Sequence, residues 1–154
     1  MKRIICLSAA LSCLVAIPAI AQTPDTVNNE VQKFVRTFVE ASNKADAKAV
    51  MEMYSRKPSV ISIDDGKITR GWEAIRSETN EIIGHEGHYK ISVGNIEVTP
   101  LGPAYALAVA PYTMALVSED GATFQIRGAI TLVLEKAAGR WLIIHDHTSS
   151  QPSE

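Results

Sequence analysis

The second half of the chain contains four strand-like runs that are separated by short turn sequences. The runs lie at 89–98, 105–117, 124–136 and 141–149, and residues rich in Gly, Pro and Asp stand between them. In the third run apolar and polar side chains alternate, which is the pattern of a strand with one buried face. Short connections favour antiparallel pairing, so the runs predict an antiparallel meander whose first strand is bulged at Gly94-Asn95.

The first half of the chain has the pattern of helices placed around a short hairpin. Apolar residues at helical spacing predict a first helix capped by Thr26 or Asn28, and a second helix over 47–54. A strand pair over 60–70, closed by an Asp-Asp-Gly-Lys turn, precedes a third helix that opens at 71–73. Because helices come first and strands last, we expect an α+β fold with N-terminal helices covering a curved antiparallel sheet.

The first residues have the composition of a secretory signal peptide. Lys2-Arg3 is a basic start, an apolar run follows over 4–17, and the small residues around 19–21 form a cleavage site. We therefore expect cleavage after Ala21 and a mature periplasmic or secreted domain over 22–154. The apolar run is shorter than the roughly 20 residues of a membrane span.

The expected mature chain is one acidic domain without cysteine. It would have 133 residues, with 13 basic and 17 acidic side chains. Both cysteines, Cys6 and Cys13, precede the cleavage site, so the domain folds without disulfides, and Cys13 leaves open a lipoprotein. No basic patch is interleaved with aromatic residues, so we expect neither nucleic acid nor, once the signal is removed, a membrane as a partner.

The last run carries the leading site candidates. On a regular strand one face is shared by Trp141, Ile143, His145, His147 and Ser149. This row predicts the floor of a pocket that is apolar at one end and polar at the other, with Asp146 pointing away from it. His titrates near neutral pH, so His145 and His147 are candidate catalytic bases. The alternative is that these imidazoles only hydrogen-bond their neighbours.

Further candidate ligand contacts lie on other elements. Arg127 and Thr131 share one face of the third run, and on a concave face Arg127 could bind an anion through two parallel hydrogen bonds. A solvated arginine is the competing interpretation. Tyr54 and Trp72, together with Trp141, could line the pocket, although large aromatic residues are also common in cores.

Neither histidine pair predicts a metal site. A His-x-His pair on a strand can bind zinc, but zinc needs a third ligand and the mature chain offers no cysteine. The second pair, His85 and His88, belongs to a Gly-flanked sequence that predicts an exposed turn. We therefore expect no metal and no other cofactor.

The order of these elements, the Gly-Trp-Glu-Ala-Ile-Arg helix start and the ending Gly-Arg-Trp-Leu-Ile-Ile-His-Asp-His-Thr-Ser carry a resemblance to a known group. The chain resembles the SnoaL-like branch of the nuclear transport factor 2-like superfamily over nearly all of the expected mature domain. It is also similar to the association domain of calcium/calmodulin-dependent kinase II. The resemblance implies a cone-shaped, cystatin-like half-barrel that encloses a pocket, and a homodimer formed through the outer face of the sheet.

The resemblance does not choose an activity, because the superfamily contains isomerases, cyclases, dehydratases, hydrolases and binding domains. We expect an exported domain whose pocket holds a small apolar or anionic ligand without catalysis. The alternative is a small isomerase, cyclase or dehydratase that uses a His base on a carbonyl-bearing substrate. Ketosteroid-isomerase chemistry needs a carboxylate inside an apolar cavity, and the strand pattern places none there, since Glu97 and Glu135 fall on solvent sides.

Overall fold

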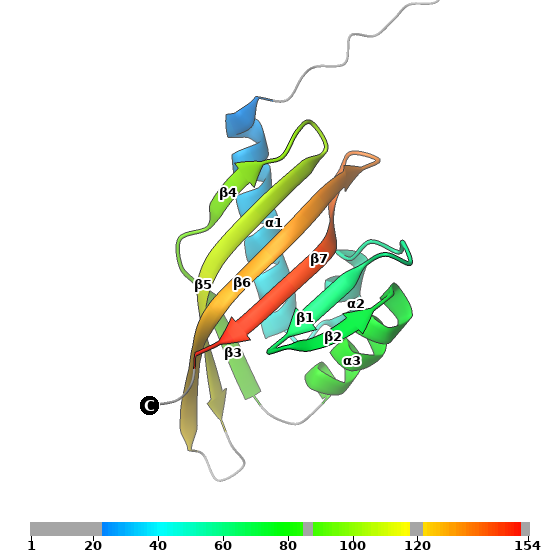
Figure 1. Cartoon of the computed structure of the whole chain (residues 1–154). Helices are drawn as coiled ribbons and strands as arrows, with labels where there is room; N and C mark the ends of the chain where they lie inside the picture. The colour runs from blue at the N-terminus through cyan, green and yellow to red at the C-terminus, as the bar shows by residue number, and fades with distance from the viewer. Residues whose placement is uncertain (1–22, 85–87, 118–121, 152–154) are drawn as a thin grey trace, which may run out of the picture.

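The computed structural model describes residues 23–84, 88–117 and 122–151 as a curved sheet with helices against one face (Figure 1). The elements in chain order are α1 (Pro24–Asn43), α2 (Ala47–Glu52), β1 (Ile61–Asp64), β2 (Lys67–Arg70), α3 (Trp72–Gly84), β3 (His88–Val93), β4 (Glu97–Pro100), β5 (Tyr105–Val117), β6 (Thr123–Ala137) and β7 (Arg140–Ser150). The predicted α+β class is confirmed. The expected signal peptide lies outside the described residues. Within the described ranges no helix has the length and apolar character needed to cross a membrane.

The sheet contains the predicted meander and one parallel addition. Its strand order is β2-β1-β7-β6-β5-β3, and β4 pairs with β5 as well. The predicted first long strand is two strands, because pairing with β5 stops between β3 and β4. At this gap the three residues 94–96 lie opposite only two residues of β5, so one extra residue falls where the bulge was predicted. The Gly94 N–H still donates to the Pro111 carbonyl at 2.9 Å, and a side chain on Gly94 would lie 2.9 Å from the Pro111 ring. On the other side β1 pairs parallel to β7 and places Ser62 opposite Asp146.

Helix α1 lies across the inner face of the sheet and supplies much of the core. It begins earlier than predicted, because Thr23 caps it by accepting from the Thr26 N–H at 3.3 Å and Pro24 occupies its first turn. Its buried stripe consists of Val27, Val31, Val35 and Val39. The stripe packs toward β3, β4 and β5, where small inner-face residues such as Ala106 and Ala108 let the helix approach the sheet closely.

Strand β7 contains a β-bulge that reverses its alternation. Leu134 of β6 lies opposite Ile143, whereas the preceding residue, Val133, lies opposite His145, so Ile144 is an extra residue in β7. Before the bulge Trp141 and Ile143 are buried, and after it Asp146 is buried. The prediction that Trp141, Ile143, His145, His147 and Ser149 share one face is therefore wrong.

Candidate functional site

A cavity of about 390 Å³ lies between the sheet and the three helices. It opens where the inner side chains of β5 become larger and less buried than the alanines that contact α1. Most of its wall is apolar, formed by Phe38, Val39, Val50, Ile75, Ile82, Ile83, Tyr89, Ile91, Val93, Tyr112, Met114, Leu116 and Ile130. The polar part is formed by Ser42, Tyr54, Ser62, Asp64, Glu78, Thr79, Asp146 and Thr148. A mainly apolar cavity with a few convergent polar groups is the usual form of a small-molecule site.

Asp146 provides a buried carboxylate in the wall of the cavity, and its side chain is 5% exposed. The Tyr54 hydroxyl donates a hydrogen bond to Oδ2, and the Ser62 hydroxyl donates to Oδ1 at 2.7 Å. The backbone N–H of Ile63 donates a third hydrogen bond. Burial raises the pKa of Asp146 above the usual aspartate range, while the three hydrogen bonds oppose this rise.

Tyr54 holds this carboxylate from the turn after α2. The turn is fixed to β7, because the Ile143 N–H donates to the Met53 carbonyl and the Ser55 N–H donates to the Ile143 carbonyl, each at 2.8 Å. The Tyr54 ring packs edge-on against Phe38, with centroids 6.1 Å apart. Burial, and secondly the negative charge of Asp146, raise the pKa of Tyr54 well above its ordinary value, so its hydroxyl remains a proton donor.

Two further carboxylates line the cavity between β1 and α3. Asp64 accepts a hydrogen bond from the Thr148 hydroxyl at 2.6 Å. Glu78 accepts from the Thr69 hydroxyl at 2.6 Å and pairs with the Lys67 ammonium at 2.5 Å. The hydrogen bond from Lys67, followed by that from Thr69, lowers the pKa of Glu78, so this side chain is ionised at neutral pH.

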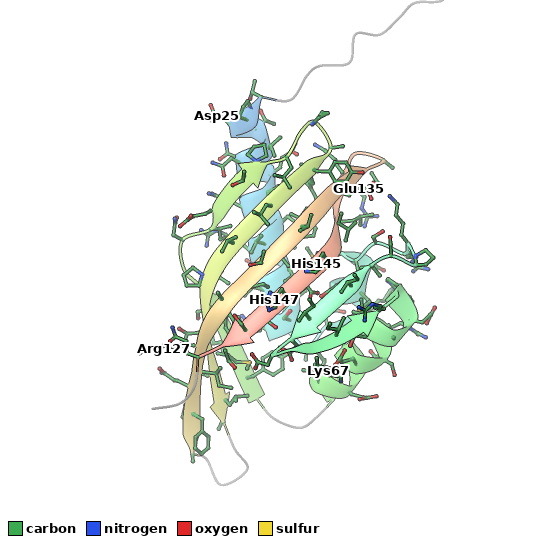
Figure 2. The ribbon with its side chains drawn as sticks, viewed as in Figure 1. Asp25, Lys67, Arg127, Glu135, His145 and His147 are labelled. Carbon is green, nitrogen blue, oxygen red and sulfur yellow. The ribbon has the colours of Figure 1, made fainter. Side chains whose placement is uncertain are left out.

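Most of the predicted site residues lie outside the cavity. His145, His147 and Ser149 follow the bulge on the outer face of the sheet, and Arg127 and Thr131 are on the same face of β6. Figure 2 labels Arg127, His145 and His147 on this face, with α1 on the far side of the sheet. The assignment of His145 and His147 as catalytic bases stays a prediction.

The predicted aromatic residues divide between the cavity and the core. Tyr54 lines the cavity. Trp141 is buried beside α1, where its indole N–H donates to Glu30 at 2.8 Å and the Lys136 ammonium lies over its ring. The Trp72 indole N–H donates to the Met51 carbonyl at 3.1 Å. The guanidinium carbon of Arg56 lies 4.5 Å from the centroid of the Trp72 ring, and that of Arg76 lies 5.3 Å from it.

Sequence reasoning missed the carboxylate of Asp146, and the expectation that no aspartate faces the cavity is wrong. One signal was present in the sequence. Three consecutive apolar residues, Leu142 to Ile144, interrupt the alternation just before the histidines, and such an interruption is compatible with a bulge. Ser62 and Glu78 had no comparable signal, because their position in the cavity depends on pairing between distant segments.

No group of three or more His, Cys, Asp and Glu side chains that could hold a metal ion occurs within 23–84, 88–117 and 122–151. The predicted turn at His85-Glu86-Gly87 lies outside these ranges. A second hollow, of about 490 Å³ and more open to solvent than the cavity, lies on the outer face of the sheet. It is lined by Lys57, Ser59, Ile61, Tyr105, Val133, Glu135, Ile144 and His145.

Comparison with known proteins shows which family and which solved structures the chain is similar to. Residues 31–154 match the SnoaL-like domain family. No curated protein matches the sequence. Solved structures with the same fold include a nuclear transport factor 2-like superfamily protein from Salmonella enterica, at 20% identity and a TM-score of 0.76, covering 85% of this chain and 95% of that one.

Two further solved structures carry provisional functional names. A protein from Streptomyces avermitilis, provisionally named a dehydratase of the NTF2-like family, is 17% identical with a TM-score of 0.77, covering 85% of this chain and all of that one. A protein from Xanthomonas campestris, provisionally named a calcium/calmodulin-dependent protein kinase II association domain, is 21% identical with a TM-score of 0.72, covering 90% of this chain and 95% of that one. At these identities the likeness concerns the fold alone.

Proposed function

Since the chain belongs to the SnoaL-like family, whose fold is shared by proteins with different provisional functions, we propose from its own cavity that it binds a small, mainly apolar molecule. The observation that carries this proposal is the buried carboxylate of Asp146 in the wall of a mainly apolar cavity. Burying a carboxylate is costly, and a hydrophobic side chain of similar size would stabilise the fold at least as well. A role in orienting a bound molecule accounts for its presence.

The carboxylate has room for a ligand. Two carboxylate oxygens offer about four acceptor positions, and Tyr54, Ser62 and the Ile63 N–H use three of them. One position is left for a donor on the bound molecule. The apolar walls formed by α1, α3 and β5 would enclose the rest of the molecule and supply most of the binding free energy through the hydrophobic effect.

A pair of tryptophan substitutions on β5 tests this proposal. Met114 lines the cavity, whereas its neighbour Thr113 lies on the opposite face of the same strand. We expect 2-naphthalenemethanol, a neutral aromatic alcohol, to raise the melting temperature of the wild type and of the Thr113→Trp variant. Met114→Trp should fill the cavity and abolish the shift. Equal shifts in all three proteins would place the binding elsewhere and refute the proposal.

A second candidate function is proton transfer on a carbonyl compound, and the raised pKa of Asp146 favours it. In this reaction the Asp146 carboxylate would remove a proton from the carbon next to the carbonyl. The C–H electron pair would form the enolate, and the proton held on Asp146 would then be delivered to another carbon of the conjugated system. A carboxylate with a pKa nearer neutrality is a better match for such a carbon acid than an ordinary aspartate.

The candidate reaction can be assayed with 3-cyclohexenone, whose conversion to 2-cyclohexenone creates a conjugated ketone that absorbs in the ultraviolet. If Asp146 is the base, Asp146→Asn abolishes the conversion, while His145→Ala and His147→Ala retain it. If one of the histidines is the base, as the sequence alone predicted, the corresponding His→Ala variant loses the conversion. Absence of conversion by the wild type counts against this candidate and leaves the binding proposal standing.

We also propose that the domain is exported, on the basis of the basic, apolar and small-residue segments over 2–21. Mass spectrometry of protein recovered from the periplasm or the medium should give an N-terminus at Gln22. Recovery of a chain that retains Met1 and stays inside the cell would refute export. A mass increase on a chain that begins at Cys13 would instead identify a lipoprotein.

A further inference from the structure

The charged side chains that line the cavity all carry the same sign. Asp64, Glu78 and Asp146 are among the lining residues, and no Lys, Arg or His of the described part of the chain is. Arg127, the sequence-predicted anion contact, lies on the outer face of the sheet. The cavity therefore offers negative charge and hydrogen-bond acceptors to a ligand, and no cation.

The charged groups around the cavity do not cancel this field. His145, on the outer face, lowers the pKa of Asp146 through its charge, but this effect is smaller than those of burial and of the three hydrogen bonds. Asp65 lies beside Asp64 and accepts a hydrogen bond from the Ser150 hydroxyl at 2.6 Å. Burial raises the pKa of Tyr112, and the negative charges of Asp65 and Asp64 raise it further. Lys67 neutralises Glu78, but its side chain is 69% exposed and it is not among the lining residues. The remaining carboxylates make the interior negative.

Aromatic rings strengthen the same preference. Phe38, Tyr54, Tyr89 and Tyr112 all line the cavity. The face of an aromatic ring is negative and attracts cations. A carboxylate or phosphate placed among these rings and the carboxylates would lose its hydration without gaining a basic partner.

We propose that the cavity selects an apolar amine, whose ammonium group donates to Asp146, and excludes apolar acids. This inference rests on the proposed function that the cavity binds a small molecule. The sequence alone predicted an apolar or anionic ligand, whereas the ligand proposed here is apolar and carries a positive charge. An ammonium group brings three donors, which matches the free acceptor position on Asp146 and the neighbouring cavity-lining oxygens. A neutral alcohol supplies one donor and is expected to bind more weakly.

A set of three probes with one ring system tests the selectivity. 2-Naphthylmethylamine, 2-naphthalenemethanol and 2-naphthoate carry a positive, a neutral and a negative group on the same apolar body. By isothermal titration calorimetry at pH 7 we expect the amine to bind at least about tenfold more tightly than the carboxylate, with the alcohol between them, since hydrogen bonds to charged groups are the stronger ones.

Two charge-removing variants locate the source of the selectivity. Asp146→Asn keeps the shape of the side chain and should reduce the affinity for the amine about tenfold, with a smaller loss for the alcohol. Glu97→Gln removes the same charge from exposed strand β4, outside the cavity, and should leave all three affinities unchanged.

Each outcome bears on a different claim. A carboxylate that binds as tightly as the amine overturns the charge selection while the binding proposal stands. An amine affinity that falls as much in Glu97→Gln as in Asp146→Asn overturns the assignment to Asp146, because general surface charge would then explain the preference. Absence of binding by all three probes to the folded wild type overturns the proposed function, and this inference with it.

Discussion

The hydrogen bond from Tyr54 to Asp146 gives the sharpest test of the site. Tyr54→Phe removes one hydroxyl and keeps the ring that packs against Phe38. The Asp146 Oδ2 then loses its donor in a position that water reaches poorly, since the side chain is 5% exposed. Ser62 and the Ile63 N–H still donate to the carboxylate, so the variant should fold.

The expected cost follows from the charge on the acceptor. Loss of a hydrogen bond to a buried charged group costs about 1.5–3 kcal/mol, compared with about 0.5–1.5 kcal/mol for a neutral pair. In an Asp146→Asn background the acceptor is neutral, so Tyr54→Phe should cost the smaller amount there. The double-mutant cycle should therefore give a coupling free energy of about 1–2 kcal/mol between the two side chains.

The pH dependence of this cost has a definite sign. Burial raises the folded-state pKa of Asp146 above its unfolded value. The resulting contribution to stability is complete below the unfolded pKa and is lost as the pH rises through the folded pKa. Removing the Tyr54 hydroxyl removes a hydrogen bond that lowers this pKa, so the folded pKa rises further and the loss extends to higher pH. Tyr54→Phe should therefore cost more at neutral pH than near pH 4, where a larger fraction of the carboxyl is protonated.

Urea unfolding measures the coupling free energy and the pH dependence of the cost. It is followed by circular dichroism at about pH 4 and pH 7.5 for the wild type, Tyr54→Phe, Asp146→Asn and the double variant. Asp146→Asn serves as the control, because it cannot titrate at this position and should flatten the pH dependence. A coupling free energy near zero would refute the reasoning. So would a cost of Tyr54→Phe that is the same at both pH values.

Three further predictions concern the sheet. Gly128→Ala should destabilise the fold by about 1–3 kcal/mol in thermal unfolding, because its Cβ would lie 2.1 Å from the Ser149 carbonyl oxygen; an unchanged melting temperature would contradict this. His147→Ala should leave probe binding unchanged in calorimetry, since His147 lies on the outer face; lost affinity would contradict the cavity assignment. We expect a homodimer through the outer face, where Ile68 and Val109 are 49% and 36% exposed, and Val109→Lys should give a monomer; a monomeric wild type in light scattering at micromolar concentration would refute this.

The sequence predicted those features that depend on local periodicity. The valine stripe of α1 and the alternation in β6 are properties of single elements, so the helices, the meander and the α+β class followed from them. The predicted cap at Thr26 or Asn28 is too late, because Thr23 caps α1 and Pro24 occupies its first turn. The break between β3 and β4 depends on their pairing with β5, where one extra residue over 94–96 interrupts the register.

The candidate site could be predicted only in part, because its geometry comes from contacts between distant segments. Tyr54 was identified as a cavity residue, but its partner Asp146 is 92 residues away in the sequence. Ser62 reaches the same carboxylate through parallel pairing of β1 with β7, which strand alternation does not indicate. The order of inward and outward side chains in β7 was inverted after Ile143, because a bulge is set by the partner strand as much as by the strand itself.

The extra residue at Ile144 also affects how this strand can change during evolution. In a regular strand the loss or gain of one residue moves every following side chain to the opposite face. Here, loss of Ile144 would close the bulge and leave Asp146 facing the helices, with His145 and His147 still outside. The length of the strand can thus differ by one residue between relatives that keep the same carboxylate in the cavity. An alignment of such relatives matches their acidic residues only when a gap is placed at the bulge.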